Sequence, residues 1–164
     1  MRPKDRTTAG HRGAGAAEAV ARGCLAAITM PATTRYVSFA RLATAHLCGL
    51  VGLSIGRIAD LRLVVDEACG QFMHGNAASS DPETPDVPLE LWFERKADQL
   101  RITVRGPIPT GWPDTESLGW LVLEALVGDV DYEVDPQDGV GTLSFDESLS
   151  ADGLPGEILW FATS

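Results

Sequence analysis

The chain has 164 residues and a mass of 17.5 kDa, which fits a single domain. Hydrophobic residues make up 45% of it and charged residues 22%, so the chain can bury a core, and disorder throughout is excluded. The formal net charge of -10 excludes a nucleic-acid surface built on bulk positive charge, because the net field would repel phosphate groups.

Three widely spaced cysteines, Cys24, Cys48 and Cys69, are an odd number and include no Cys-x-x-Cys pair. We therefore expect no disulfide framework and no zinc site, but small core residues in a reducing compartment. The longest weakly apolar stretch, 42–56, is shorter than the ~20 residues that a membrane-spanning helix needs. No export signal is recognisable, so we expect a cytoplasmic protein without membrane contact.

The chain divides into three expected segments: a flexible tail at 1–23, a folded domain at 24–146 and a C-terminal extension at 147–164. Charge is distributed unevenly along them. No lysine or arginine follows Arg105, whereas the remaining 59 residues carry twelve carboxylates. This asymmetry favours a partner with a basic surface. The alternative is a solvated acidic face that keeps the protein soluble.

The N-terminal half of the domain predicts one strand and two helices. Residues 24–30 form a short apolar run that ends at a proline, which predicts a strand. A helix is expected to follow, with Thr33 or Thr34 as its N-cap. A second helix is expected from about Arg57 to His74, because apolar residues recur there every three or four positions.

The C-terminal half predicts two hairpins separated by a helix. Apolar and polar residues alternate at 87–93 and again at 100–104, which predicts the first hairpin. A helix is expected at 117–127, and a second hairpin at 130–134 and 140–145. This order of elements predicts an α+β fold, a two-layer sandwich of a mainly antiparallel mixed sheet with helices on one face.

Three stretches of the sequence resemble the GHKL, or Bergerat-fold, ATPases, and among these the anti-sigma factors of the RsbW and UsfX type. They are 59–71 (ADLRLVVDEACGQ), 116–130 (ESLGWLVLEALVGDV) and 139–145 (GVGTLSF). The resemblance covers roughly residues 24 to 146, with the stretches in the family's order and spacing. It implies the Bergerat fold.

The resemblance also implies roles for two residues of the predicted second helix. Glu67 stands where active members have a glutamate that acts as a general base. One turn later, Gln71 stands where they have an asparagine that coordinates Mg²⁺. Glutamine is one methylene longer, and Mg²⁺ demands near-ideal octahedral geometry, so we expect weakened metal binding.

The other nucleotide-binding elements that the resemblance implies are incomplete. Arg105 or Gly106 stands where the family has an aspartate that accepts a hydrogen bond from adenine, and an arginine cannot accept one. Gly119 keeps one glycine of a pair in the lid, with Ser117 at the other place. Thr142 matches the family threonine.

Some of these residues also allow other interpretations. Glu67, Gln71 and His74 share one helix face, which is also typical of the exposed polar side of an amphipathic helix. As a zinc site the set is disfavoured, since a neutral amide is a poor zinc ligand. Trp112 and Trp160 lie outside the predicted core elements, so each is either an interface residue or folds back onto the domain.

The resemblance implies an anti-sigma factor that sequesters an alternative sigma factor of the stress or sporulation type. It also implies a homodimer that an anti-anti-sigma protein of the STAS class releases from the sigma factor. Because the motifs are incomplete, we expect nucleotide-independent partner switching without a bound cofactor or direct nucleic-acid binding. One alternative is an active serine/threonine kinase that phosphorylates the STAS antagonist with Mg-ATP. A second is a small-ligand sensor that uses a remodelled pocket near Arg105.

Overall fold

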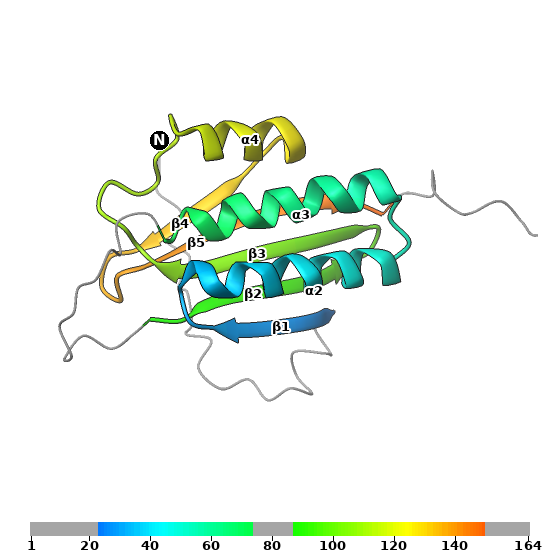
Figure 1. Cartoon of the computed structure of the whole chain (residues 1–164), viewed down its shortest axis with the longest axis horizontal. Coiled ribbons are helices and arrows are strands. Elements are labelled where there is room, and N and C mark those ends of the chain that lie inside the picture. Colours follow the sequence, from blue (N-terminus) through cyan, green and yellow to red (C-terminus); the bar gives the residue numbers. More distant parts are fainter. Residues whose placement is uncertain (1–22, 74–86, 150–164) are drawn as a thin grey trace, which may run out of the picture.

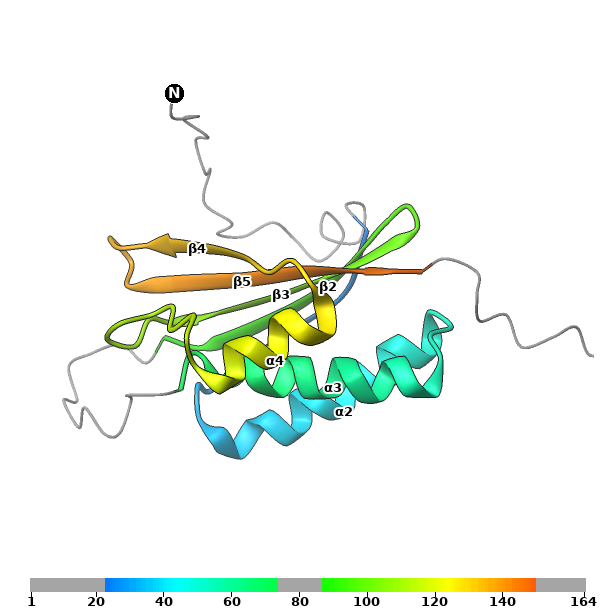
Figure 2. The same ribbon diagram turned by 90° about the horizontal axis from the view of Figure 1, so that it is seen from above.

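The computed structural model describes residues 23–73 and 87–149, which form a five-stranded sheet with helices on one face (Figures 1 and 2). The strands are β1 (Cys24–Met30), β2 (Leu89–Lys96), β3 (Gln99–Pro107), β4 (Asp131–Asp135) and β5 (Val140–Ser148). The helical elements are the 3-10 turn η1 (Thr34–Tyr36) and the helices α2 (Val37–Leu50), α3 (Ile55–Gly70) and α4 (Leu118–Val127). In Figure 1 the helices lie side by side in the order α2, α3, α4, with α4 over the β4–β5 side of the sheet.

The strand order is β1-β2-β3-β5-β4, and every neighbouring pair of these described strands is antiparallel. The predicted two-layer α+β sandwich with helices on one face is confirmed, and its sheet is antiparallel rather than mixed. Both predicted hairpins are present, β2 with β3 and β4 with β5. Only Ala97 and Asp98 separate β2 from β3, and Ala97 adopts a φ of 55°, as tight hairpin turns require.

The alternation of side chains along β3 sets the two faces of the sheet. Leu100, Ile102 and Val104 are fully buried beneath the helices. Arg101 and Arg105 alternate with these buried positions and therefore point to the face without helices, which we call the open face. This face is uncovered by any helix of the described part of the chain (Figure 2).

Helix α2 covers the β1–β2 side and begins later than the sequence predicts. Its buried positions recur at helical intervals and are Val37, Ala40, Thr44 and Cys48. Thr33 is the N-cap residue of the 3-10 turn η1 that leads into α2, but its side chain makes no capping hydrogen bond, and the N-cap of α2 itself is Tyr36. Within the described ranges, no helix is long and apolar enough to cross a membrane.

Helix α3 starts two residues before the predicted position, because the Ser54 hydroxyl accepts a hydrogen bond from the Arg57 N–H at 3.3 Å. The helix ends at Gly70, with Gln71 as its C-cap. His74, residues 1–22 of the proposed tail at 1–23 and residues 150–164 of the proposed extension at 147–164 lie outside the described residues. At the other end of the domain, β5 continues to Ser148, two residues past the expected boundary at 146.

Two of the three cysteines pack in the core as predicted. Cys48 and Cys69 are fully buried, and burial raises the pKa of each thiol to about 12. Nearby carboxylates, Glu147 for Cys48 and Asp66 for Cys69, add to that rise. Cys24, on β1, is only half-buried. At neutral pH the two buried groups are therefore protonated thiols that act as small apolar side chains.

A buried ion pair joins α3, α4 and β5. The Arg57 guanidinium donates to both carboxylate oxygens of Glu147, at 2.7 Å and 2.6 Å. Its third nitrogen donates to the Leu126 carbonyl at the end of α4, at 2.8 Å. The hydrogen bonds to Glu147, with a smaller contribution from Asp60, raise the pKa of Arg57 despite its partial burial. We call this set of contacts the Arg57 clamp.

Replacing Glu147 with alanine will leave the Arg57 cation without its main partner in a poorly solvated place. We expect the free energy of unfolding to fall by about 2–3 kcal/mol, measured by urea denaturation. The matched control is Asp146→Ala, whose carboxylate pairs with Arg101 on the open face and should contribute less than about 1 kcal/mol. Equal losses in the two variants would contradict a special role for the clamp.

Candidate functional site between two helices and the sheet

The end of α3 faces the beginning of α4, and this contact brings together four residues singled out in the sequence. The Gln71 side-chain amide donates to the Ser117 hydroxyl at 3.4 Å. A Cβ atom built on Gly119 would lie 2.7 Å from Glu67 Oε2 and 3.0 Å from Gln71 Nε2. A side chain at this position would require the ends of the Glu67 and Gln71 side chains to shift. The structure thus places Glu67, Gln71, Ser117 and Gly119 side by side.

The Ser117 hydroxyl organises the first turn of α4. It accepts the backbone N–H of Trp120 at 3.2 Å and donates to the Asp114 carbonyl at 2.7 Å. The bond from Gln71 adds a second donor to the same oxygen, and Gln71 is only 6% exposed. The interpretation of Gln71 as an exposed polar residue is therefore wrong. Its amide nitrogen ties the N-cap of α4 to the end of α3.

Glu67 is half-buried beside this same helix end. A carboxylate next to a helix N-terminus is stabilised by the helix dipole and by backbone N–H groups that have no partner within the helix. Glu67 can therefore help to position α4, independently of any catalytic role. Among the described residues, no group of three or more histidine, cysteine, aspartate or glutamate side chains has the geometry to hold a metal ion.

Aromatic side chains occupy the space between α4 and the ends of β3 and β5. Trp112 packs against Phe72 with ring centroids 5.3 Å apart and against the edge of Tyr132 at 6.1 Å. Trp120, on α4, meets Tyr132 edge-on at 5.7 Å. We call these four residues the aromatic cluster. Trp112 thus folds back onto the domain, and its buried Nε1–H has no hydrogen-bond partner. Trp160 lies outside the described residues.

Two glycines on the strands make room for the aromatic cluster. A Cβ atom on Gly106 would lie 2.9 Å from Phe72 Cγ, and one on Gly141 would lie 2.8 Å from the Trp112 ring. Neither glycine has a positive φ, so the missing side chain matters here for space and not for backbone conformation. Gly106 therefore faces the helix layer, where Phe72 occupies the space next to it.

Thr142 and Arg105 lie on the opposite face of the sheet from this contact. Thr142 pairs in register with Arg105 on β3 and Glu133 on β4. Arg105 Nη1 donates to Glu90 at 2.9 Å. Side chains alternate along a strand, so Gly141 and not Thr142 faces the helices. The structure does not bring Thr142 together with Glu67 and Gln71.

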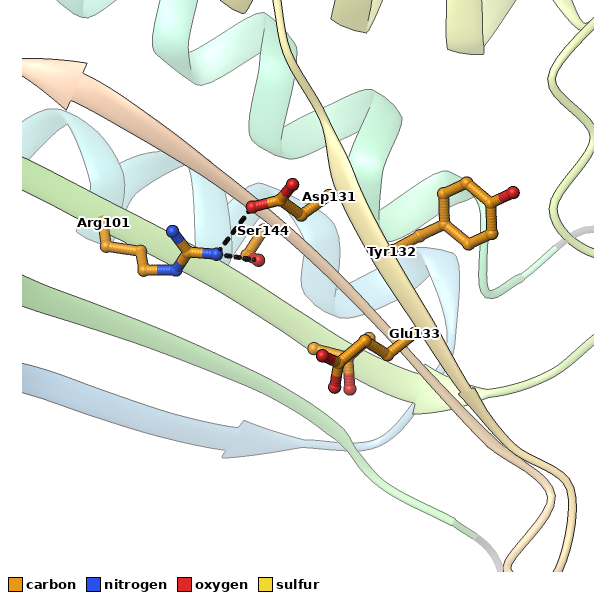
Figure 3. A pocket seen from close by; sticks show the side chains of 6 residues that line it. Arg101, Asp131, Tyr132, Glu133 and Ser144 are labelled. Carbon is orange, nitrogen blue, oxygen red and sulfur yellow. Dashed lines mark hydrogen bonds and ion pairs between the residues drawn. The ribbon is translucent and has the colours of Figure 1, made fainter. Parts of the chain in front are cut away.

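The open face around Thr142 carries a shallow hollow of about 510 Å³. Its lining is polar and comprises Arg101, Asp131, Tyr132, Glu133, Thr142 and Ser144. Arg101 donates to Asp131 at 2.9 Å and to Ser144 at 2.7 Å, as Figure 3 shows. Because the guanidinium is already bonded to these groups, it is poorly placed to bind an added anion.

No family model matches the sequence, and no curated protein matches it. Among solved structures, one similar fold is that of the RsbU and RsbW domains of Rv1364c from Mycobacterium tuberculosis, with a TM-score of 0.58 and 17% identity. The match covers 75% of this chain and 32% of that one, so this chain spans about a third of that protein's length. The fold is similar to that of the RsbW domain.

A second similar structure is the SiaB–SiaC complex from Pseudomonas aeruginosa, with a TM-score of 0.57 and 11% identity. That match covers 79% of this chain and 93% of the other. At such identities the likeness concerns the fold alone. The RsbW-like fold agrees with the fold class that the sequence resemblance implied.

Sequence reasoning did not predict the aromatic cluster within this RsbW-like fold. Phe72 and Trp120 look like ordinary core positions of helices, and Tyr132 lies on a strand that is exposed along its whole length. The available signal was the pairing of large aromatic residues with Gly106 and Gly141 on neighbouring strands. Sequence reasoning also missed the Arg57 clamp, whose partners are 90 residues apart.

Replacing Gly141 with alanine will force the Trp112 ring from its place. We expect a loss of about 1–3 kcal/mol in the free energy of unfolding and a change in near-ultraviolet circular dichroism. The control is Gly56→Ala in α3, where an added Cβ meets no atom within 4 Å. That change should be neutral or slightly stabilising. Unchanged stability and spectra of the Gly141 variant would show that Trp112 does not fill this space in solution.

Proposed function

We propose that this protein is an anti-sigma factor that sequesters an alternative sigma factor of the stress or sporulation type. A STAS anti-anti-sigma protein would release the sigma factor by competing for the anti-sigma factor, in the cytoplasm and without nucleotide turnover. The RsbW-like fold and the sequence resemblance to RsbW-type anti-sigma factors support this proposal. The resemblance also supports a homodimer as the working form.

One observation carries the nucleotide-independent part of the proposal: the chain's own side chains fill the space beside Glu67 and Gln71. Phe72 packs against Gly106 and Trp112 packs against Gly141. Position 106 also has no carboxylate that could accept a hydrogen bond from adenine. The residues present therefore do not fit Mg-ATP. In this proposal Glu67 and Gln71 position α4 instead of activating a nucleotide.

The outer side of α2 offers a surface for a protein partner. Phe39 and Leu42 are 53% and 67% exposed, which is unusual for large apolar side chains on a helix of a folded domain. They line a hollow of about 540 Å³ together with Ser38, Arg41, Ala45 and Arg62. Among the described residues, Arg41 forms a long ion pair with Asp66, at 3.8 Å. We propose that the sigma factor and its antagonist compete for this side of α2.

The decisive experiment for the function is affinity capture from lysate of the source cells, with and without Mg-ATP, followed by mass identification. We expect a sigma factor in the eluate in equal amounts under both conditions. The variant Glu67→Ala should capture as much sigma factor as the natural protein, because no chemistry of Glu67 is required. Capture of no sigma factor under either condition would overturn the proposal.

The same experiment tests the kinase alternative. An active kinase predicts a partner set that changes with Mg-ATP, phosphate transfer to the STAS antagonist, and loss of that transfer in Glu67→Ala. It also predicts a rise in melting temperature on adding Mg-ATP, since a ligand that binds the native state must stabilise it. Melting scans with other metabolites test the small-ligand sensor, whose pocket near Arg105 would lie on the open face of the sheet.

The proposed α2 surface is tested by Leu42→Ser, which removes exposed apolar area without touching the core. We expect the affinity for the captured sigma factor to fall about tenfold, measured by surface plasmon resonance. Leu50→Ser is the matched control, because Leu50 is 69% exposed on the same helix but does not line the hollow. Equal affinities of both variants and the natural protein would place the interface elsewhere.

A further inference from the structure

Helix α4 is apolar on nearly all sides and carries one charged residue, Glu124. The Glu124 carboxylate accepts the Trp120 indole N–H at 2.9 Å, so it is engaged within the helix. Trp120 and Leu123 face the core, whereas Leu118 and Leu121 are 77% and 53% exposed. A helix that is apolar all round is normally covered on all sides.

The exposed apolar residues of α4 form a continuous strip. Leu118, Leu121 and Ala125 are exposed and spaced i, i+3, i+7, which places them on one side of the helix. We call these three residues the α4 strip. Helix α4 is the outermost helix of the layer, with α3 as its only helical neighbour among the described elements (Figure 1).

The charged residues around the α4 strip are acidic. Asp114 and Glu116 precede the helix, and Asp129 follows it. On the neighbouring helix, Glu67 lies beside Gly119, and Asp60 lies beside Arg57. Residues 106–149 contain no lysine or arginine.

Arg57, the cation that contacts the end of α4, is already bonded to Glu147 and Asp60. Arg101 lies on the opposite face of the sheet, where it pairs with Asp131 and Asp146. The α4 strip therefore combines exposed leucines with a surrounding rim of acidic residues, Asp114, Glu116 and Asp129, whose negative charge is not balanced by neighbouring cations among the described residues. The hollow beside α2 differs, because its lining carries Arg41 and Arg62.

We propose that the α4 strip docks a basic amphipathic helix of a partner protein. Side chains at i, i+3 and i+7 on one helix form a ridge that packs into the groove of a second helix. Lysine or arginine residues that flank the partner's apolar face would meet the carboxylates of the rim. Complementary charge then raises the association rate and excludes acidic partners. This proposal does not depend on the proposed anti-sigma function.

The test uses a fluorescein-labelled peptide of about 18 residues made of leucine and lysine, with leucine at helical intervals. Its binding to the full-length protein is followed by fluorescence anisotropy. We expect Leu121→Ser to weaken binding about tenfold and Leu50→Ser, on α2, to leave it unchanged. A double variant, Glu116→Gln with Asp129→Asn, should also bind more weakly and show a shallower dependence on salt.

Four results would overturn the proposal. Equal binding of a peptide with the same composition in scrambled order would show that the binding depends on net charge alone. Unchanged affinity of Leu121→Ser would remove the strip from the interface. A dimeric natural protein that becomes monomeric in Leu121→Ser, measured by light scattering, would assign the strip to a second copy. A clear loss of thermal stability in Leu121→Ser would instead show that this chain covers the strip itself, and would equally contradict the proposal.

Discussion

The packing of α4 against α3 is the constraint on which the placement of β4 and of the aromatic cluster depends. At its N-terminal end, Gly119 lets the helix approach Glu67, and Ser117 caps the first turn while accepting a bond from Gln71. At its C-terminal end, the Leu126 carbonyl accepts a bond from Arg57 of the clamp. With both ends fixed, the strand β4 that follows is placed at the edge of the sheet. Tyr132 of β4 then meets Trp120 and Trp112, which completes the aromatic cluster.

Local periodicity was enough to predict the elements of this fold and their order. The alternation along 100–104 and the three- and four-residue spacing at 58–72 are short-range patterns, and each matches a described strand or helix. Patterns of this kind cannot reveal contacts between distant residues. The bond from Arg57 to Glu147 joins residues 90 positions apart, and no local sequence pattern around either residue predicts it. The face of the sheet on which Thr142 lies could not be predicted either, because a shift of one residue along a strand moves a side chain to the other side of the sheet.

The fold places the basic and acidic residues of the sequence beside different helices. Arginines gather beside exposed apolar side chains on the outer side of α2, whereas the rim of α4 is acidic. The two helices lie on either side of α3, so the molecule offers two apolar surfaces with opposite electrostatic preference (Figure 1). If both proposed surfaces bind partners, complementary charge would favour different partners at each. Such an arrangement lets one small domain distinguish between partners by charge as well as by shape.

The glycines of the candidate site show how one fold can serve different chemistry. Within the described residues, Gly106, Gly119 and Gly141 all leave space that another part of the chain takes: Phe72, Glu67 with Gln71, and Trp112. A glycine that would let a ligand approach the backbone here lets a side chain approach it instead. That exchange removes free volume from the interior and adds packing between α3, α4 and the sheet. The proposals for this protein therefore rest on the outer surface of the helices, with its exposed apolar residues and the charges around them.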